Sequence, residues 1–249
     1  MANYSVGIVG LGNFGKFLVA LVPSRARIYG FDTSKNKNMI PRRVEITDLA
    51  TVAKTDVLII AVPLSGYRDL LKELRCLVSQ NTLIIDICSV KLLPDRLFDE
   101  YLPGHQNLLL THPLFGPRFT PRGIKGQKLV VTKSIGQKAK QILDFCTQNL
   151  GLEVVRMKAK EHVKIMATVH VLPYFLGRSL ANMNIKKQTV TLPSYKKILD
   201  FVDFDKSHSA ELYATILQGN PYASEARKML MESMKEVDNK LNQDTSTIK

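Results

Sequence analysis

Three glycines close to the N-terminus constrain this chain more than any other feature. Gly10, Gly12 and Gly15 follow a short apolar run, residues 4–9, and precede a helical pattern that opens at Lys16. In such a strand–turn–helix context the first glycine permits a tight turn, the second lets a pyrophosphate approach the backbone, and the third lets the helix pack against the strand. The helix N-terminus also offers unpaired N–H groups to the phosphates. The residues predicted to hold a dinucleotide are Gly10, Leu11, Gly12, Asn13, Phe14 and Gly15.

Asp32 completes this βαβ unit and indicates the type of dinucleotide. It ends the predicted second strand, 27–31, about twenty residues after Gly10, which is the usual separation in such units. A carboxylate there accepts hydrogen bonds from the ribose hydroxyls and repels the 2′-phosphate of NADP, so we expect NAD, with NADP as the less favoured cofactor. Lys35 and Lys37 follow closely, and their positive charges complicate this preference for NAD. The alternatives are a glycine turn that binds nothing and a surface aspartate in a turn.

Continuous apolar runs predict the rest of the sheet. Uniformly apolar strands are buried on both faces, as in parallel sheets covered by helices. Helical stretches such as 67–77 lie between some of them. The alternation predicts an α/β fold with a doubly wound, Rossmann-type parallel sheet. The predicted strands are 4–9, 27–31, 56–62, 82–87, 107–111, 128–132 and 153–157.

The pattern changes from strands to helices near residue 158. We therefore expect two domains, a dinucleotide-binding domain over residues 1–158 and a smaller, all-helical domain over residues 159–249. Pro193 and the Gly219-Asn220-Pro221 segment separate the helical stretches. The predicted helices of the second domain are 161–183, 195–217 and 221–241.

Composition narrows the function classes without choosing among them. The formal net charge is +13, and the Lys and Arg residues are spread along the chain without interleaved aromatic residues. A basic solvated surface is the first interpretation, attraction of a small anionic substrate the second, and nucleic acid binding a distant third. The three cysteines are scattered, which argues against a disulfide framework or a metal site and fits a reducing, cytoplasmic compartment. No apolar run is long enough to cross a bilayer and no signal pattern opens the chain, so we expect no membrane partner.

Two predicted strands end in segments that carry reactive side chains. Ligands of parallel sheets bind beyond the carboxyl ends of the strands, where loops hold functional groups on a rigid frame. Segment 86–91 supplies a hydroxyl and an amine, from Ser89 and Lys91, and segment 111–117 supplies the imidazole of His112. A histidine between a strand end and Pro and Gly turns is a candidate general base, although a single histidine is more often structural. We expect the three groups to converge near the nicotinamide.

Five short motifs occur in order along the chain. They are GLGNFG at 10–15, AVP at 61–63, DxxSVK at 86–91, THPLFGP at 111–117 and Glu161-His162. The combination resembles the prephenate and arogenate dehydrogenases of tyrosine biosynthesis, and the resemblance covers nearly the whole chain. The spellings GLGNFGKFL and THPLFGP look most similar to the plant-type arogenate dehydrogenases, as does the helix that contains Phe175-Leu176-Gly177-Arg178.

This resemblance implies an oxidative decarboxylation. A cyclohexadienol with a ring carboxylate and a side-chain carboxylate would lose a hydride to NAD and its ring carboxylate as carbon dioxide, with aromatisation driving the step. The resemblance makes His112 the catalytic histidine, which takes the proton of the ring hydroxyl, and Ser89 the serine that hydrogen-bonds the same region and orients His112. Lys91 either places positive charge near the substrate or supports the loop. Val62 and Pro63, in the AVP motif, would contact the cofactor.

The resemblance also implies roles for the helical domain, which in the family completes the substrate pocket and forms a homodimer. His170 lies where relatives place a substrate-facing polar residue, or it is a helix histidine satisfied by a neighbour. An acidic side chain in the pocket would favour the ammonium of arogenate over the keto group of prephenate. Asp203 and Asp205 are the candidates, or are solvated helix charges, and we lean to arogenate. The candidate partners of the substrate carboxylates are Arg178, Lys206, Arg118 and Arg122.

Several residues of the family pattern are absent from this chain. The family's Glu-His-Asp is Glu161-His162-Val163 here, and Phe204 stands where several bacterial members have a carboxylate-binding arginine. Plant-type members usually have an acidic residue at the position of Arg118 and Ser-Arg, which suits NADP, at Phe31-Asp32. Two alternatives therefore stay open: a dehydrogenase of a 4-amino prephenate analogue in a secondary pathway, and a non-catalytic NAD-binding sensor or partner protein. Retention of both candidate catalytic residues argues against the non-catalytic protein.

Overall fold

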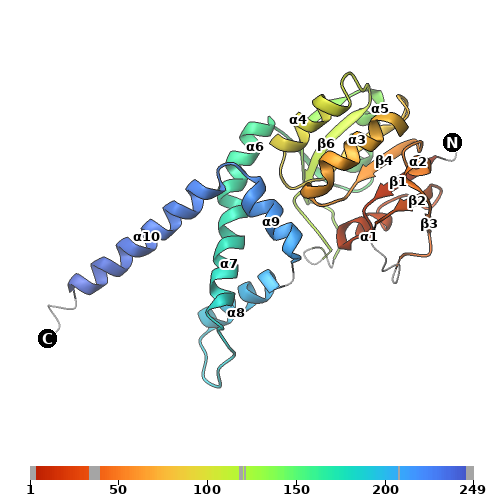
Figure 1. Ribbon diagram of the computed structural model, residues 1–249. Helices are drawn as coiled ribbons and strands as arrows, with labels where there is room; N and C mark the ends of the chain where they lie inside the picture. The colour runs from red at the N-terminus through yellow and green to blue at the C-terminus, as the bar shows by residue number, and fades with distance from the viewer. Residues whose placement is uncertain (1–3, 34–39, 118–119, 121, 207, 245–249) are drawn as a thin grey trace. The chain divides into compact units, whose positions relative to one another are not determined.

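The structure is a computed structural model that describes residues 4–33, 40–117, 120, 122–206 and 208–244. The chain divides into two compact units, Met1–His162 and Val163–Lys249. Figure 1 shows an α/β unit that contains the N-terminus and an all-helical unit that contains the C-terminus. The α/β fold class and the helical C-terminal part expected from the sequence are confirmed.

The first unit is built on one eight-stranded sheet, in the order β3-β2-β1-β4-β5-β6-β7-β8. The chain reverses its direction of travel across the sheet between β1 and β4, and this switch point is where doubly wound sheets bind ligands. All neighbouring strands are parallel except β6 and β7. The strands are β1 (Ser5–Val9), β2 (Arg27–Phe31), β3 (Val44–Ile46), β4 (Val57–Ile60), β5 (Leu83–Asp86), β6 (Leu108–Pro113), β7 (Lys128–Ile135) and β8 (Glu153–Arg156).

Helices cover both faces of this sheet. Buried side chains of α1 (Asn13–Val19) and α5 (Gln137–Gln148) pack in one core. Buried side chains of α2 (Leu49–Val52), α3 (Tyr67–Leu77) and α4 (Leu92–Tyr101) pack in another. The two layers leave the strand ends as the place where loops meet.

The alternation of side chains along each strand separates the two cores. Ile8 and Val9 are neighbours in β1 and both are buried, yet they belong to different cores. On α3, Leu70, Leu71 and Leu74 recur at helical spacing and bury one stripe of that helix against the sheet. The central strands are thus buried on both faces, as their uniformly apolar sequences predicted.

The direction of β7 differs from the prediction of a parallel strand. It runs antiparallel to β6. A parallel return needs a crossover of a dozen or more residues, usually a helix. The described residues between β6 and β7 form no helix, so the chain turns back beside the strand it has just left. The edge strand β3 is also new, because a run of three residues gives no recognisable pattern.

The helix predicted over 161–183 is interrupted. It consists of α6 (Ala159–Met166), a π-helical turn (Ala167–Val171) and α7 (Leu172–Asn182). Pro173 gives the physical reason, because it has no N–H to donate to the preceding turn and its ring crowds the carbonyl there. The backbone widens to π spacing just before this proline, as helices do where the regular ladder is broken.

The helix predicted over 195–217 is two helices, α8 (Pro193–Lys206) and α9 (Ala210–Gly219). Ser209 separates them, because its side chain accepts a hydrogen bond from the backbone N–H of Leu212 and caps α9. The sequence contained this signal, since serine is among the preferred N-cap residues.

The last helix, α10 (Ala223–Asp244), begins in the core of the second unit and then carries exposed apolar side chains. Figure 1 shows its C-terminal half clear of the other helices of this unit. The core at its start consists of Val171, Tyr174, Ile216, Leu217 and Ala223. The exposed apolar residues are Met229, Met231, Met234, Val237 and Leu241. Over the described residues, the structure contains no helix that meets the length and apolarity needed to span a bilayer.

Candidate active site

The glycine-rich loop between β1 and α1 has the three features that a dinucleotide requires. Gly10 has a φ of 93°, and a Cβ atom there would lie 2.5 Å from the carbonyl oxygen of Ala61. A Cβ atom on Gly15 would lie 2.0 Å from the carbonyl oxygen of Gly10, so this close approach of helix and strand needs glycine. At Gly12 a Cβ atom would meet nothing within 4 Å. The open side of Gly12 is the place where a pyrophosphate can approach the backbone.

Asp32 is held against this loop. Its Oδ2 atom accepts a hydrogen bond of 2.6 Å from the backbone N–H of Leu11. The N–H of Gly10 donates to the carbonyl oxygen of Phe31, at 2.9 Å, so β2 and the loop are tied at two successive residues. Lys35 and Lys37, whose positive charges complicate the preference for NAD, lie outside the described residues.

A cluster of three phenylalanines joins the glycine-rich loop to the THPLFGP segment. The ring centroids of Phe14 and Phe115 are 6.5 Å apart, and that of Phe17 is 5.6 Å from Phe14 and 6.4 Å from Phe115. The hydroxyl of Thr120 donates to the carbonyl oxygen of Gly116, at 2.9 Å, and steadies the segment. The predicted cofactor loop and the segment that carries the predicted base are therefore packed together within one unit.

His112 lies at the carboxyl end of β6 and is 6% exposed. Its Nδ1 atom is 2.9 Å from Nε2 of His162, which is fully buried in α6. The two rings meet edge to face, with centroids 5.1 Å apart and an angle of 78° between their planes. In the sequence His162 stands out only as part of the Glu161-His162 motif, and this contact could not be predicted from it.

Lys91 is fully buried, and its contacts show what it does. Its ammonium donates to the carboxylate of Asp86 and to the carbonyl oxygen of Thr111. Asp86 also accepts from the hydroxyl of Tyr67 and from the backbone N–H of Cys88. Of the two roles left open for Lys91, the structure places it in support of the loop, where it ties the ends of β5 and β6 together. Its assignment to the substrate is not supported by these contacts.

The same network sets the protonation of its neighbours. Burial, together with the negative charge of Asp86, raises the pKa of Tyr67 well above its ordinary value. Burial and the same carboxylate raise the pKa of Cys88 to about 12. Both groups are therefore neutral at physiological pH. The hydroxyl of Tyr67 can donate to Asp86, and the Cys88 thiol is not a nucleophile. No sequence motif singles out Tyr67.

Ser89 follows the end of β5, next to the end of β6 in the sheet. Its Oγ atom is buried and has no hydrogen-bond partner among the described residues. A buried hydroxyl without a partner costs free energy unless a ligand or water satisfies it. The partner of Nδ1 of His112 is Nε2 of His162, so the orienting role expected of Ser89 stays a prediction.

Val62 and Pro63 follow β4, on the strand next to β1 in the sheet. The carbonyl oxygen and backbone of Ala61 lie against Gly10, as the close approach described above requires. The AVP segment therefore borders the glycine-rich loop, on the side of the sheet switch point.

Most of the remaining predicted residues lie in the helical unit, and several already have partners there. Burial, reinforced by the imidazole of His208, lowers the pKa of His170 to about 4. The guanidinium of Arg178 lies 4.1 Å from the ring centroid of Tyr213. Phe204 occupies the position at which a carboxylate-binding arginine was sought. Its ring packs on that of His208, with the ring centroids 4.5 Å apart. A histidine neutral at pH 7 does not supply the missing positive charge.

Three further candidates for the substrate are solvent-facing. Lys206 and Asp203 are exposed on α8, and Arg122 is exposed in a turn. Arg118 and the side chain of Asp205 lie outside the described part of the chain.

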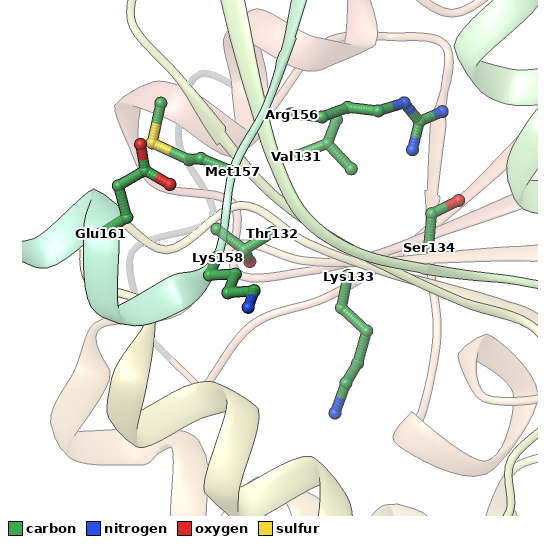
Figure 2. A pocket seen from close by; sticks show the side chains of 8 residues that line it. All are labelled: Val131, Thr132, Lys133, Ser134, Arg156, Met157, Lys158 and Glu161. Carbon is green, nitrogen blue, oxygen red and sulfur yellow. The ribbon is translucent and has the colours of Figure 1, made fainter.

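A pocket of about 540 Å³ lies on the first unit (Figure 2). Its walls come from β7, β8 and the start of α6. Lys133 in its wall is already paired, with its ammonium 2.7 Å from Asp95 and 2.8 Å from Asp99. We do not assign the substrate to this pocket, because neither the glycine-rich loop nor His112 lines it. The lining residues are Val131, Thr132, Lys133, Ser134, Arg156, Met157, Lys158 and Glu161.

The chain is similar to known proteins over most of its length. A family model described as the nucleotide-binding domain of prephenate dehydrogenase matches residues 20–134, and one described as a TYRAAT1-like C-terminal domain matches residues 179–249. Arogenate dehydrogenase 1, chloroplastic, of Arabidopsis thaliana is 27% identical over 223 residues, which cover 84% of this chain. The chain is thus similar to the prephenate and arogenate dehydrogenases.

Other relatives extend the similarity to nearly the whole chain. Arogenate dehydrogenase 2, chloroplastic, of Arabidopsis thaliana is 28% identical over 252 residues, which cover 92% of this chain and 68% of that protein. The chain spans only 35% of the length of arogenate dehydrogenase 1. The solved prephenate dehydrogenase of A. aeolicus, in complex with hydroxyphenyl propionate and NAD+, superposes with a TM-score of 0.76. That match is 20% identical and covers 99% of this chain and 93% of that one, and it confirms the fold.

Proposed function

We propose that this protein is an NAD-dependent dehydrogenase that oxidatively decarboxylates arogenate or prephenate. The observation that carries the proposal is the buried imidazole of His112 at the end of β6, joined to the glycine-rich loop through the contact of Phe115 with Phe14. The match of residues 20–134 to the nucleotide-binding domain of prephenate dehydrogenase and the names of the curated relatives support this class of substrate.

The described residues fit a nicotinamide dinucleotide. The open side of Gly12 accommodates the pyrophosphate, and the carboxylate of Asp32 beside Leu11 accepts ribose hydroxyls. A carboxylate accepts several hydrogen bonds, so the bond from Leu11 leaves Asp32 able to bind a ribose. Its negative charge disfavours the additional phosphate of NADP, which is why we propose NAD. The nicotinamide, when bound, supplies the acceptor for a hydride.

His112 performs the proton transfer in this proposal. Its imidazole takes the proton of the ring hydroxyl as the hydride leaves the carbon that carries this hydroxyl, and a ring ketone results. Loss of the ring carboxylate as carbon dioxide returns its electron pair to the ring. The proton then returns from His112 to the oxygen, and an aromatic phenol is formed.

Ser89 binds the same hydroxyl region in this proposal. Its buried Oγ atom has no partner among the described residues, and a substrate hydroxyl satisfies it. This hydrogen bond from Ser89 aligns the substrate oxygen with His112 for proton transfer. The transfer is fast only when the oxygen and the imidazole are held in the right geometry.

The test uses the full chain with NAD or NADP and with arogenate, prephenate or the 4-amino analogue of prephenate. Absorbance of the reduced nicotinamide is recorded together with released carbon dioxide, and equal amounts of both are expected from arogenate or prephenate. Turnover of the 4-amino analogue alone would assign the protein to a secondary pathway. Cofactor binding without turnover of any substrate would favour the non-catalytic sensor.

A variant without the proposed base tests the role of His112. His112→Asn is expected to keep its affinity for NAD and to lose about 10²–10⁴-fold in kcat, the usual contribution of a general base. Equal turnover in this variant would remove His112 from its role.

We also propose that the protein is a homodimer formed through its helical unit. Met234, Val237 and Leu241 recur on α10 at intervals of three and four residues, the spacing of a seam between paired helices. Each is more than half exposed, and an apolar stripe of this length marks an interaction surface in soluble proteins.

Sedimentation velocity tests the dimer at micromolar concentration. The wild-type chain is expected to sediment as a dimer, and Val237→Glu as a monomer, because the change places a charge in the seam. Asn239→Glu introduces the same charge on an exposed position off the stripe and is expected to remain dimeric. A monomeric wild type, or an unchanged Val237→Glu, would rule out this interface.

A further inference from the structure

We propose that His162 is the positioning residue that makes His112 a base, by holding its imidazole in one tautomer and one orientation. The inference rests on the proposed role of His112. Its physical basis is the 2.9 Å contact between Nδ1 of His112 and Nε2 of His162, buried within the first unit.

Counting protons on the two rings leads to the tautomer. A neutral imidazole carries one N–H, so a base that accepts a proton at Nε2 must carry its own hydrogen at Nδ1. Nδ1 of His112 then donates to Nε2 of His162. His162 must accept there, so its own hydrogen lies at Nδ1. The opposite arrangement, with His162 donating, leaves the hydrogen of His112 at Nε2 and abolishes the base.

The backbone fixes both rings in place. His112 in β6 pairs with Val130 in β7, and the next residue, Val131, accepts a hydrogen bond of 3.1 Å from the N–H of Met157. Met157 lies just before α6, where the backbone N–H of His162 donates to the carbonyl oxygen of Lys158 at 3.0 Å. The backbone segments that carry the two imidazoles are thus joined through neighbouring strands of one sheet. This restricts movement of one ring away from the other.

The acceptor in this pair is neutral, which distinguishes it from the usual arrangement. Bases of this kind are commonly oriented by a carboxylate, which fixes the tautomer and also stabilises the imidazolium. His162 provides the hydrogen bond without a negative charge. Its contribution is therefore geometric, and it should appear in kcat and leave substrate affinity unchanged.

Two substitutions separate a positioning role from a packing role. His162→Leu keeps an apolar side chain in the buried site and removes the acceptor. His162→Gln places an amide oxygen near the position of Nε2 and restores it. We expect His162→Leu to lower kcat about 10²-fold with KM for NAD and substrate unchanged, and His162→Gln to recover kcat to within about tenfold of wild type.

His105 offers a matched control. It is also a buried histidine of the first unit, 4% exposed, and its Nε2 atom donates to the carbonyl oxygen of Thr82 at 2.9 Å. His105→Leu should cost stability as His162→Leu does, while kcat of the folded protein stays at the wild-type value. If both leucine variants lower kcat equally, the effect of His162 is one of packing and the proposal fails.

Nitrogen NMR of the histidine rings tests the pair without any substrate. In the full chain labelled with ¹⁵N-histidine, at mildly alkaline pH, we expect the hydrogen of His112 at Nδ1 and that of His105 at Nε2. The resonances are assigned from His112→Asn and His105→Leu. A hydrogen at Nε2 of His112 would overturn the proposal.

The NMR result is independent of the reaction. If turnover is absent from the wild type but His112 carries its hydrogen at Nδ1, and does so only while His162 can accept, the pairing stands and the proposed function falls. If turnover is present and His162→Leu leaves both kcat and the tautomer unchanged, the proposed function stands and the pairing falls.

Discussion

Lys91→Met gives the clearest test of the buried network behind the site. The substitution removes the ammonium that donates to Asp86 and to the carbonyl oxygen of Thr111, while keeping a long apolar side chain in its place. Asp86 then stays fully buried without a cation. Removing one partner of a buried ion pair costs about 3–5 kcal/mol of unfolding free energy.

The structure places Lys91→Met near the lower end of that range. The carboxylate of Asp86 keeps two donors, the hydroxyl of Tyr67 and the N–H of Cys88, and these compensate part of the loss. A loss of about 3 kcal/mol corresponds to a fall of roughly 6–12 °C in Tm for a protein of this size. The free energy is measured by denaturant unfolding and Tm by differential scanning calorimetry.

Two controls decide the interpretation. Lys133→Met removes an ammonium that is paired with Asp95 and Asp99 at the surface, and it should cost no more than about 1 kcal/mol. Lys91→Met combined with Asp86→Asn should recover part of the loss, because no buried charge remains. A variant Lys91→Met with normal stability and a KM for substrate raised many-fold would refute this reasoning and return Lys91 to the substrate.

The other predictions concern the cofactor loop and the helical unit. Gly15→Ala should destabilise the first unit strongly, because its Cβ would lie 2.0 Å from a backbone oxygen. Gly12→Ala should keep the stability of the wild type and lose affinity for NAD. Thermal unfolding measures the stability of each variant, and a cofactor titration measures its affinity for NAD. Asp32→Ala should narrow the ratio of kcat/KM for NAD over NADP, and an unchanged ratio would refute the ribose contact. His170 has its pKa lowered to about 4, so the unfolded chain binds more protons below pH ~6.5 and stability should fall by about 3 kcal/mol as pH drops from ~6.5 to ~4. His170→Phe should flatten that dependence in denaturant unfolding, and an equally steep curve would assign it to other groups.

The elements that local patterns specify could be predicted from the sequence. Strands buried on both faces have continuous apolar sequences, and the glycine spacing followed by Asp32 describes a loop whose geometry depends on adjacent residues. The direction of β7 could not be predicted, because an apolar run looks the same in a parallel and in an antiparallel strand. Only the connection from β6 determines the direction. Pro173 carried a signal for the interrupted helix, and Ser209 carried one for the start of α9.

The sequence identified the candidate site residues, but the side chains that contact them could not be predicted. His112 was identified from its position at a strand end, but its partner His162 is fifty residues away, and the contact depends on the register of β6, β7 and β8. Lys91 was identified from a motif, but whether its ammonium points to substrate or to Asp86 depends on burial that only the packed sheet creates. Tyr67 has no motif and enters the site only through its contact with Asp86.

The cost of the site argues for catalysis over a sensor that only binds the cofactor. A cofactor-binding protein needs the glycine-rich loop and Asp32, and both could persist on a stable fold with an apolar strand end. This chain instead buries two imidazoles in contact and leaves the hydroxyl of Ser89 without a partner among its described residues. Each buried polar group costs free energy unless it is fully satisfied, and leucine or alanine at these positions would avoid that cost. Polar groups that break the apolar pattern of a core are expected where they act on a ligand, and here His112 belongs to the segment that packs on the loop that would hold the cofactor.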